Sequence, residues 1–167
     1  MPVYVSEYAA ELRTLGHQVF AVRYPCPVLV VKGVSGNLKD SSGKGGTLVT
    51  EDIMDHLRQA SLLIGRVFLL RKGRGAAPGP VTIGRTAGND VPIPEYSISQ
   101  RHCMVRLELQ GALLSDTGST NGTFVDGTRL LPQKPVLLGD GTEITLGRFV
   151  FVFHTAAGFS AMLATQS

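Results

Sequence analysis

The sequence has little cysteine, no tryptophan and no long apolar run. Its two cysteines, Cys26 and Cys103, are too few for a disulfide framework or a zinc site built of thiolates. No basic residue precedes Arg13 and no apolar run of signal-peptide length is found near the start, so we expect a protein that is not secreted. The longest uncharged stretch, from Phe149 to Ser167, contains a histidine, a glycine and several hydroxyls, and predicts a strand plus a tail rather than a membrane span. We therefore expect a soluble, cytoplasmic protein without a membrane partner.

Signatures of catalysis and metal binding are also missing. No pair of carboxylates stands out as an acid and a base, and the glycine-rich segment 33–46 lacks the spacing of a phosphate loop. Ser41 and Lys44 match a serine–lysine hydrolase pattern by letters alone, because no rigid element aligns the hydroxyl with the amine. Metal-ligand spacing is absent among the four histidines, which are His17, His56, His102 and His154. The sequence therefore predicts no enzyme, no metal and no cofactor.

The formal net charge is +3 and the isoelectric point about 9.1. Residues 1–59 contain six basic and six acidic side chains, whereas residues 60–155 contain ten basic and seven acidic ones, so the excess lies in the second part. This balance suits an anionic ligand but falls short of the basic stripe of a nucleic-acid-binding protein, and we expect no nucleic-acid partner. A basic cluster of Arg71, Lys72 and Arg74 is expected to be ordinary solvated charge.

The first sixty residues predict a mixture of helix and strand. Apolar residues at helical spacing over residues 5–15 predict a helix, with Ser6 as its N-cap and Gly16 just beyond its end. The runs His17–Tyr24 and Val28–Lys32 are rich in apolar and β-branched residues, which favours strands. Two prolines interrupt these runs, so we expect edge strands or a corner.

From Ser61 onward the pattern changes to many short strands, which predicts a mainly β, antiparallel sandwich or barrel. Asn-Gly or Asp-Gly pairs at 121–122, 126–127 and 140–141 supply the positive φ that tight turns need. Alternation over the strand at 103–109 places Val105, Leu107 and Leu109 on one face. The predicted strands are Leu62–Leu70, Val81–Ile83, Cys103–Leu109, Ala112–Leu114, Thr123–Val125, Pro135–Leu138, Thr142–Leu146 and Phe149–Phe153.

Three groups of polar residues lie at the ends of these strands. Gly84-Arg85 directly follows one strand, and the run Ser99-Gln100-Arg101-His102 leads into another. The turn at 116–123 has the sequence Asp-Thr-Gly-Ser-Thr-Asn-Gly-Thr and joins two further strands. Because all three groups lie at strand ends, a sandwich can collect them on one rim.

This set closely resembles the signature of the forkhead-associated (FHA) domain, a phosphothreonine-recognition module. The Gly-Arg, Ser-x-x-His, Asn-Gly-Thr, Gly-Asp and Leu-Gly pieces occur in the family's order between Ser61 and His154. The resemblance implies an FHA-like antiparallel β-sandwich whose apical loops bind a phosphorylated peptide. We accordingly expect a small α+β extension over residues 1–60, the FHA domain over residues 61–155 and a short tail over residues 156–167.

By this resemblance, five residues contact the phosphopeptide. Arg85 and Ser99 are implied as phosphate ligands; a planar, always-charged fork and a hydroxyl donor suit a group of roughly −1.5 to −2 charge. Gln100 stands where the family often has arginine, lysine or asparagine, and its amide can donate without bringing a charge. Thr120 and Asn121 match the positions that contact the phosphorylated residue and the peptide backbone.

Other residues are implied to shape the loops. Gly84 and Gly122 allow tight turns near the phosphate, and His102 braces the binding loops. Asn121 has a purely structural alternative, because a hairpin turn at this point needs it whatever it binds. Arg101 and Arg129 are expected to be rim charges that steer anionic peptides.

Thr50 has two interpretations. A hydroxyl followed by two carboxylates is typical of a helix start, and predicts a helix from Thr50 to about Ala60. FHA domains commonly read the residue three after the phosphothreonine, which here is Ile53. A phosphorylated Thr50 that binds its own chain or a neighbour is therefore the alternative, although the sequence favours the helix cap.

The sequence thus predicts a non-catalytic adaptor that binds phosphothreonine-containing proteins of a Ser/Thr kinase pathway. The alternative is a phosphate-independent scaffold or oligomerisation protein built on the same sandwich, with its first sixty residues as the association surface. The joint presence of Arg85, Ser99 and Asn121 favours the phosphopeptide reader, because a scaffold does not require these three residues.

Overall fold

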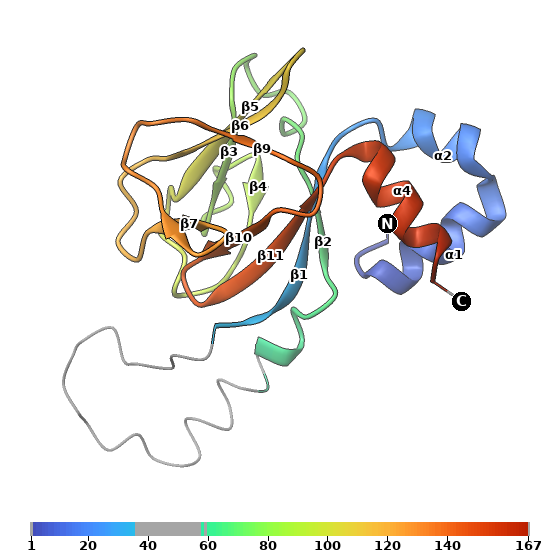
Figure 1. Cartoon of the computed structure of the whole chain (residues 1–167), viewed down its shortest axis with the longest axis horizontal. Helices are drawn as coiled ribbons and strands as arrows, with labels where there is room; N and C mark the ends of the chain where they lie inside the picture. Colours follow the sequence, from blue (N-terminus) through green and yellow to red (C-terminus); the bar gives the residue numbers. More distant parts are fainter. Residues whose placement is uncertain (1, 36–57, 59, 167) are drawn as a thin grey trace.

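Two β-sheets packed face to face form the centre of the computed structural model, which describes residues 2–35, 58 and 60–166 (Figure 1). In these residues one sheet has six antiparallel strands, in the order β2 (Val67–Leu69), β1 (Val28–Val34), β11 (Phe149–His154), β10 (Glu143–Leu146), β7 (Thr123–Val125) and β8 (Thr128–Arg129). The other sheet has five strands, in the order β4 (Val91–Pro92), β3 (Val81–Gly84), β5 (Cys103–Glu108), β6 (Gly111–Asp116) and β9 (Val136–Leu138). Its strands are antiparallel except for β4, which is parallel to β3. The prediction of a mainly β sandwich is confirmed.

The core lies between the two inner faces, because apolar residues alternate with more exposed ones along the strands. In β11, Phe149, Phe151 and Phe153 are fully buried while the valines between them are only partly covered. The opposite sheet contributes residues such as Val105 and Leu114, which are 1% exposed. This inter-sheet core fixes the register of every strand whose end carries a loop of the site.

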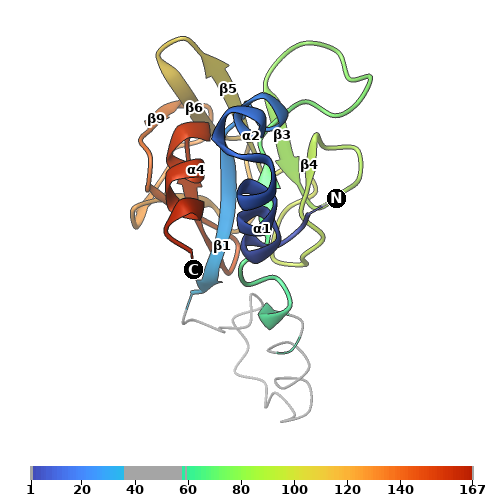
Figure 2. The ribbon, with the colours of Figure 1, turned by 90° about the vertical axis from the view of Figure 1, so that its right-hand side faces the viewer.

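Three helices cover the outer face of β1 and β2: α1 (Val5–Leu15), α2 (His17–Arg23) and α4 (Ala156–Ala164) (Figures 1 and 2). Their interface is a second core, in which Tyr8, Phe20 and Phe159 pack on Val28 and Val30. The ring centroids of the first and last of these aromatics are 5.5 Å apart in an edge-to-face arrangement. The sandwich therefore carries a third layer, built from both ends of the described chain.

Two predicted elements are wrong in kind. The run at 17–24 is the helix α2 rather than a strand, because Gly16, with φ of +81°, ends α1 and lets a second helix begin at once. Within α2 only Phe20 is buried, and it packs on Tyr24 and Phe159 where a strand would have needed alternate residues inside. The expected C-terminal tail is also a helix, α4, which is capped by the Thr155 hydroxyl accepting from the Gly158 amide.

The placement of two N-terminal features also differs from expectation. β1 is not an edge strand or a corner, since it pairs with β2 on one side and β11 on the other. Helix α1 begins after Tyr4 instead of at Ser6, and the Glu7 carboxylate accepts the Tyr4 amide at 2.9 Å. The first sixty residues thus supply an inner strand of the sandwich as well as two helices.

The predicted strands from β3 to β11 are present, with differences confined to their edges. Strands β4 and β8, of two residues each, were not foreseen. Leu107 and Leu109, expected on the inner face with Val105, are exposed because the β5–β6 hairpin extends beyond the sandwich (Figure 1).

The expected helix from Thr50, the alternative role of Thr50, His56 and most of the glycine-rich segment lie outside the described residues. None of the helices in the described ranges is long and apolar enough to cross a membrane.

Phe159→Ala tests the helical layer. Phe159 is 1% exposed, and its loss leaves a cavity among Tyr8, Phe20 and the sheet, so we expect the free energy of unfolding to fall by about 3 kcal/mol. Urea denaturation followed by circular dichroism measures this change. Val22→Ala, at a site 82% exposed, is the control and should change stability by less than about 0.5 kcal/mol. Equal midpoints for the two variants would contradict the packing described.

Candidate functional site

Arg85 is held at the end of β3 by the loop that precedes β5. Its backbone amide donates to the Ser99 carbonyl at 2.9 Å. Its guanidinium Nη1 donates to the carbonyls of Tyr96 and Ile98 at 3.3 and 3.2 Å. These contacts fix the direction of a partly exposed side chain while leaving its remaining N–H groups available to a ligand.

Ser99 joins this loop to the turn between β6 and β7. Its hydroxyl oxygen accepts the Thr120 backbone amide at 2.9 Å, so the hydroxyl hydrogen is left to donate elsewhere. Ser99 is half-buried, whereas Thr120 is exposed. One hydrogen bond therefore sets the spacing between two of the loops that the sequence expected to meet.

His102 holds the same two loops together from beneath. It is fully buried; its Nδ1 accepts the Ser99 amide at 3.1 Å, and its Nε2 lies 2.8 Å from the Gly122 carbonyl. Since Nδ1 accepts, Nε2 carries the proton and donates to that carbonyl. Burial lowers the pKa of His102, against the opposing effects of the Gly122 hydrogen bond and the Asp116 charge. The imidazole is consequently a neutral brace, and it does not reach the rim.

Asn121 is fixed by its own side chain. Its Nδ2 donates to the Ser97 carbonyl at 2.8 Å, which leaves the amide oxygen and the second N–H for other partners. The Asn121-Gly122 pair does not form a hairpin, because β6 and β7 belong to different sheets. The structure thus gives Asn121 a role in linking two loops across the top of the sandwich.

A buried ion pair lies under the loop at 93–99. Arg148, which immediately precedes β11, donates through Nε and Nη2 to the Glu95 carboxylate at 2.9 and 2.8 Å, and both side chains are at most 7% exposed. Ser97 closes the group: its hydroxyl donates to Glu95 and accepts the Arg148 amide at 3.0 Å. The Arg148 guanidinium also stacks 4.6 Å from the centre of the Tyr96 ring.

Asp116 organises the turn at 116–123. Burial alone would raise its pKa, but hydrogen bonds from Ser119, Thr123 and Gly118 outweigh this effect and lower the pKa of Asp116 below its ordinary value. The carboxylate therefore acts as the acceptor that shapes this turn, and it points into the fold.

The two implied glycines act differently from each other. A Cβ at Gly84 would lie 2.2 Å from the Gln100 carbonyl, so glycine is needed there for close approach of two loops. Gly122 has φ of +86°, which disfavours other residues, and a Cβ there would also meet the Arg129 guanidinium at 2.9 Å. Gln100 itself is exposed, and the structure gives its side chain no hydrogen bond within the described residues.

The five residues predicted to contact the phosphopeptide therefore lie on connected loops. Arg85, Ser99, Thr120 and Asn121 are joined directly or through one backbone group, and Gln100 is next in sequence to Ser99. Sequence reasoning missed Glu95, Ser97 and Arg148, which lie beneath the rim. Their only signal was the Leu-Gly piece that immediately precedes Arg148.

Residues 81–147 match the family model of the FHA domain. This chain contains an FHA domain. The match runs from the first residue of β3 to the turn after β10, so it includes every site residue described above except Arg148.

Known proteins with FHA domains are similar to the chain over part of their length. The mouse protein "Angiogenic factor with G patch and FHA domains 1" is 36% identical over 110 residues, which is 61% of this chain and 15% of that protein. "FHA domain-containing protein FhaA" of Mycobacterium tuberculosis is 35% identical over 105 residues, which is 63% of this chain and 17% of that protein. The chain thus spans less than a fifth of either relative.

A solved structure described as "Structural and functional analysis of phosphothreonine-dependent FHA domain interactions" is also similar. The sequence identity is 25% and the TM-score is 0.49, with 78% of this chain and 96% of that chain covered.

The protonation state of His102 is directly measurable. We expect nitrogen-15 NMR to show a neutral imidazole with the proton on Nε2 at pH 7, and a pKa below the ordinary histidine value of about 6.5 that is expected for the urea-unfolded chain. Because the folded-state pKa is depressed, the stability that neutral His102 contributes is present above about pH 6.5 and is lost as the pH falls through the folded pKa. A folded-state pKa equal to or above the unfolded value would contradict the bracing geometry.

Proposed function

We propose that this chain is a phosphothreonine-dependent protein-interaction module. The single observation that carries the proposal is the fixed pairing of Arg85 with Ser99 on the rim of an FHA domain. The Arg85 amide binds the Ser99 carbonyl, and the loop carbonyls at 96 and 98 orient the guanidinium. The Arg85 guanidinium and the Ser99 hydroxyl are thus positioned side by side before a ligand binds.

The remaining donors suit the three oxygens of a phosphate group. Nη1 of Arg85 bonds to two carbonyls, so Nε and Nη2 are left for charge-assisted bonds to phosphate. The Ser99 hydroxyl keeps its hydrogen because it accepts from Thr120. We propose Gln100 as an uncharged donor at the same rim, where its exposed amide gives it reach without adding a charge.

Asn121 and Thr120 are proposed to hold the peptide itself. Asn121 uses one N–H on the Ser97 carbonyl, and its amide oxygen and other N–H can meet the main chain of an extended peptide. Thr120 is exposed beside Ser99, where it can contact the methyl group that distinguishes phosphothreonine from phosphoserine. Gly84, His102 and Gly122 position these residues without touching the ligand.

The biological setting remains part of the proposal. We propose partners that carry phosphothreonine within a Ser/Thr kinase pathway, and a function that is binding without a catalytic step. We also propose a cytoplasmic location, which is supported by two buried cysteines with free thiols. The phosphopeptide-reading residues all belong to 61–155, while β1 from the first sixty residues completes one of the sheets.

Arg85→Ala is the decisive variant. A hydrogen bond to a charged group contributes about 1.5–3 kcal/mol, so we expect phosphothreonine-peptide affinity to fall by one to two orders of magnitude or more. Fluorescence anisotropy with a degenerate peptide library in phosphothreonine, phosphoserine and unmodified forms measures this loss. The matched control is Arg13→Ala, which removes an exposed arginine from α1 in the helical layer.

We expect the wild-type protein and the control to bind only the phosphothreonine form, with the same affinity. Unchanged affinity of the folded Arg85→Ala variant would remove Arg85 from the site. Failure of the folded wild-type protein to bind any form would favour the phosphate-independent scaffold.

A further inference from the structure

A groove with a basic lining lies at the edge of the sandwich, between β2 and β4. Its lining comes from both sheets, because β2 is an edge strand of the six-stranded sheet and β4 is an edge strand of the five-stranded sheet. The groove has a volume of about 780 Å³ and a floor formed by β2 and by Val91 and Pro92 of β4. Arg85, Ser99 and Asn121 do not line it, so it is separate from the proposed phosphate site.

The groove concentrates positive charge. Arg66, Arg71, Lys72 and Arg74 line it against a single acidic residue, Asp90, which gives four positive charges minus one. That difference of three equals the formal net charge of the whole chain, +3. Arg71, Lys72 and Arg74, which the sequence predicted to be ordinary solvated charges, thus line a groove. Arg66, the residue before β2, is the fourth cation of its lining.

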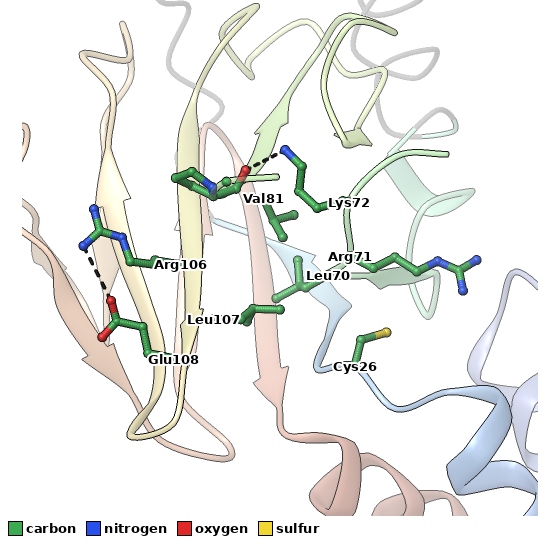
Figure 3. A pocket seen from close by; sticks show the side chains of 10 residues that line it. Cys26, Leu70, Arg71, Lys72, Val81, Arg106, Leu107 and Glu108 are labelled. Atoms are coloured by element: carbon green, nitrogen blue, oxygen red, sulfur yellow. Dashed lines mark hydrogen bonds and ion pairs between the residues drawn. The ribbon is translucent and has the colours of Figure 1, made fainter. Parts of the chain in front are cut away.

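The four basic side chains differ in their contacts within the protein. Lys72 is neutralised within the fold, because its ammonium donates to Asp90 at 2.7 Å. It also donates to the Pro80 carbonyl at 2.9 Å (Figure 3). The guanidinium carbon of Arg66 lies 4.7 Å from the centre of the Phe68 ring, in a cation–π contact. Arg71 and Arg74 are exposed. Within the described residues, none of these three arginines forms an ion pair.

A second hollow adjoins the basic loop and differs in character. It has a volume of about 600 Å³ and is lined by apolar side chains such as Leu70 and Leu107, and its Arg106 is paired with Glu108. Figure 3 shows Arg71 extending away from Arg106 and Leu107. Arg71 and Lys72 line both hollows, whereas Arg66 and Arg74 line only the groove.

We propose that the groove binds an acidic, extended polypeptide segment of a protein partner, independently of phosphothreonine. The guanidiniums of Arg66, Arg71 and Arg74 lie along one groove and complement a run of carboxylates in an extended segment. A nucleic acid is disfavoured because the two aromatic residues that line the groove, Tyr8 and Phe68, are only 2% and 6% exposed, so neither offers a ring face on which a base can stack. The inference does not depend on the rim, so it stands or falls separately from the proposed function.

The test uses the full chain and an unphosphorylated, fluorescein-labelled peptide of about ten residues in which glutamate alternates with serine. A glutamine–serine peptide of the same length and a single-stranded oligonucleotide of similar charge are the comparison probes. We expect the glutamate peptide to bind, the glutamine peptide not to bind, and the affinity to fall steeply between about 50 and about 300 mM salt. Amide NMR shifts on binding should cluster at residues 66–74 and 90–92.

Arg71→Gln with Arg74→Gln removes two exposed charges from the groove, and we expect the affinity for the glutamate peptide to fall about tenfold. Arg13→Gln with Lys134→Gln removes two exposed charges elsewhere and is the matched control, with an expected change of less than about twofold. The same samples are titrated with the phosphothreonine library, whose binding the groove variant should retain.

Three results would overturn the proposal: no binding of the glutamate peptide, an equal loss in the control variant, or tighter binding of the oligonucleotide at the same residues. None of them bears on whether the phosphothreonine library binds.

Discussion

The loops that carry the site depend on one buried imidazole. His102 accepts from the Ser99 amide on one side and donates to the Gly122 carbonyl on the other, so it ties a loop of the five-stranded sheet to a turn that crosses to the six-stranded sheet. Desolvation keeps the ring neutral, and neutrality is what allows one nitrogen to accept while the other donates. Ser99, Thr120 and Gly122 are placed through this ring. The rim is therefore rigid because a polar group without access to water must keep both of its partners.

A second buried polar group, the ion pair under the loop at 93–99, supports the same part of the site. The Glu95 carboxylate, the Ser97 hydroxyl and the Arg148 guanidinium satisfy one another beneath the residues whose carbonyls orient Arg85. Nη1 of Arg148 is the one buried side-chain nitrogen or oxygen in the described part of the chain without a hydrogen-bond partner. Loss of either charge would leave the other buried and uncompensated, which is strongly unfavourable. The buried ion pair of Glu95 and Arg148 thus supports the loop that orients the Arg85 guanidinium on the surface.

The sequence predicted the sandwich well because its strands are short, alternate clearly and are separated by Asp-Gly or Asn-Gly turns. It failed where tertiary packing decides the outcome. The run at 17–24 has the composition of a strand, yet burial of Phe20 against Phe159, more than a hundred residues away, favours a helix. The site residues were predictable because each belongs to a short local motif. Glu95 and Arg148 were not, since their pairing spans 53 positions and neither residue is unusual in its local context.

The pairing of β1 with β11 also determines when this protein can fold. Val28 lies opposite His154, so an inner strand near the start of the chain finds its partner 126 residues later. The six-stranded sheet therefore cannot close, and the helices cannot cover its outer face, until β11 and α4 have been synthesised. Such a high contact order slows folding, and it leaves the apolar face of β1 exposed to other chains in the meantime. Synthesis on the ribosome is thus the stage at which this domain is most open to aggregation and most in need of chaperones.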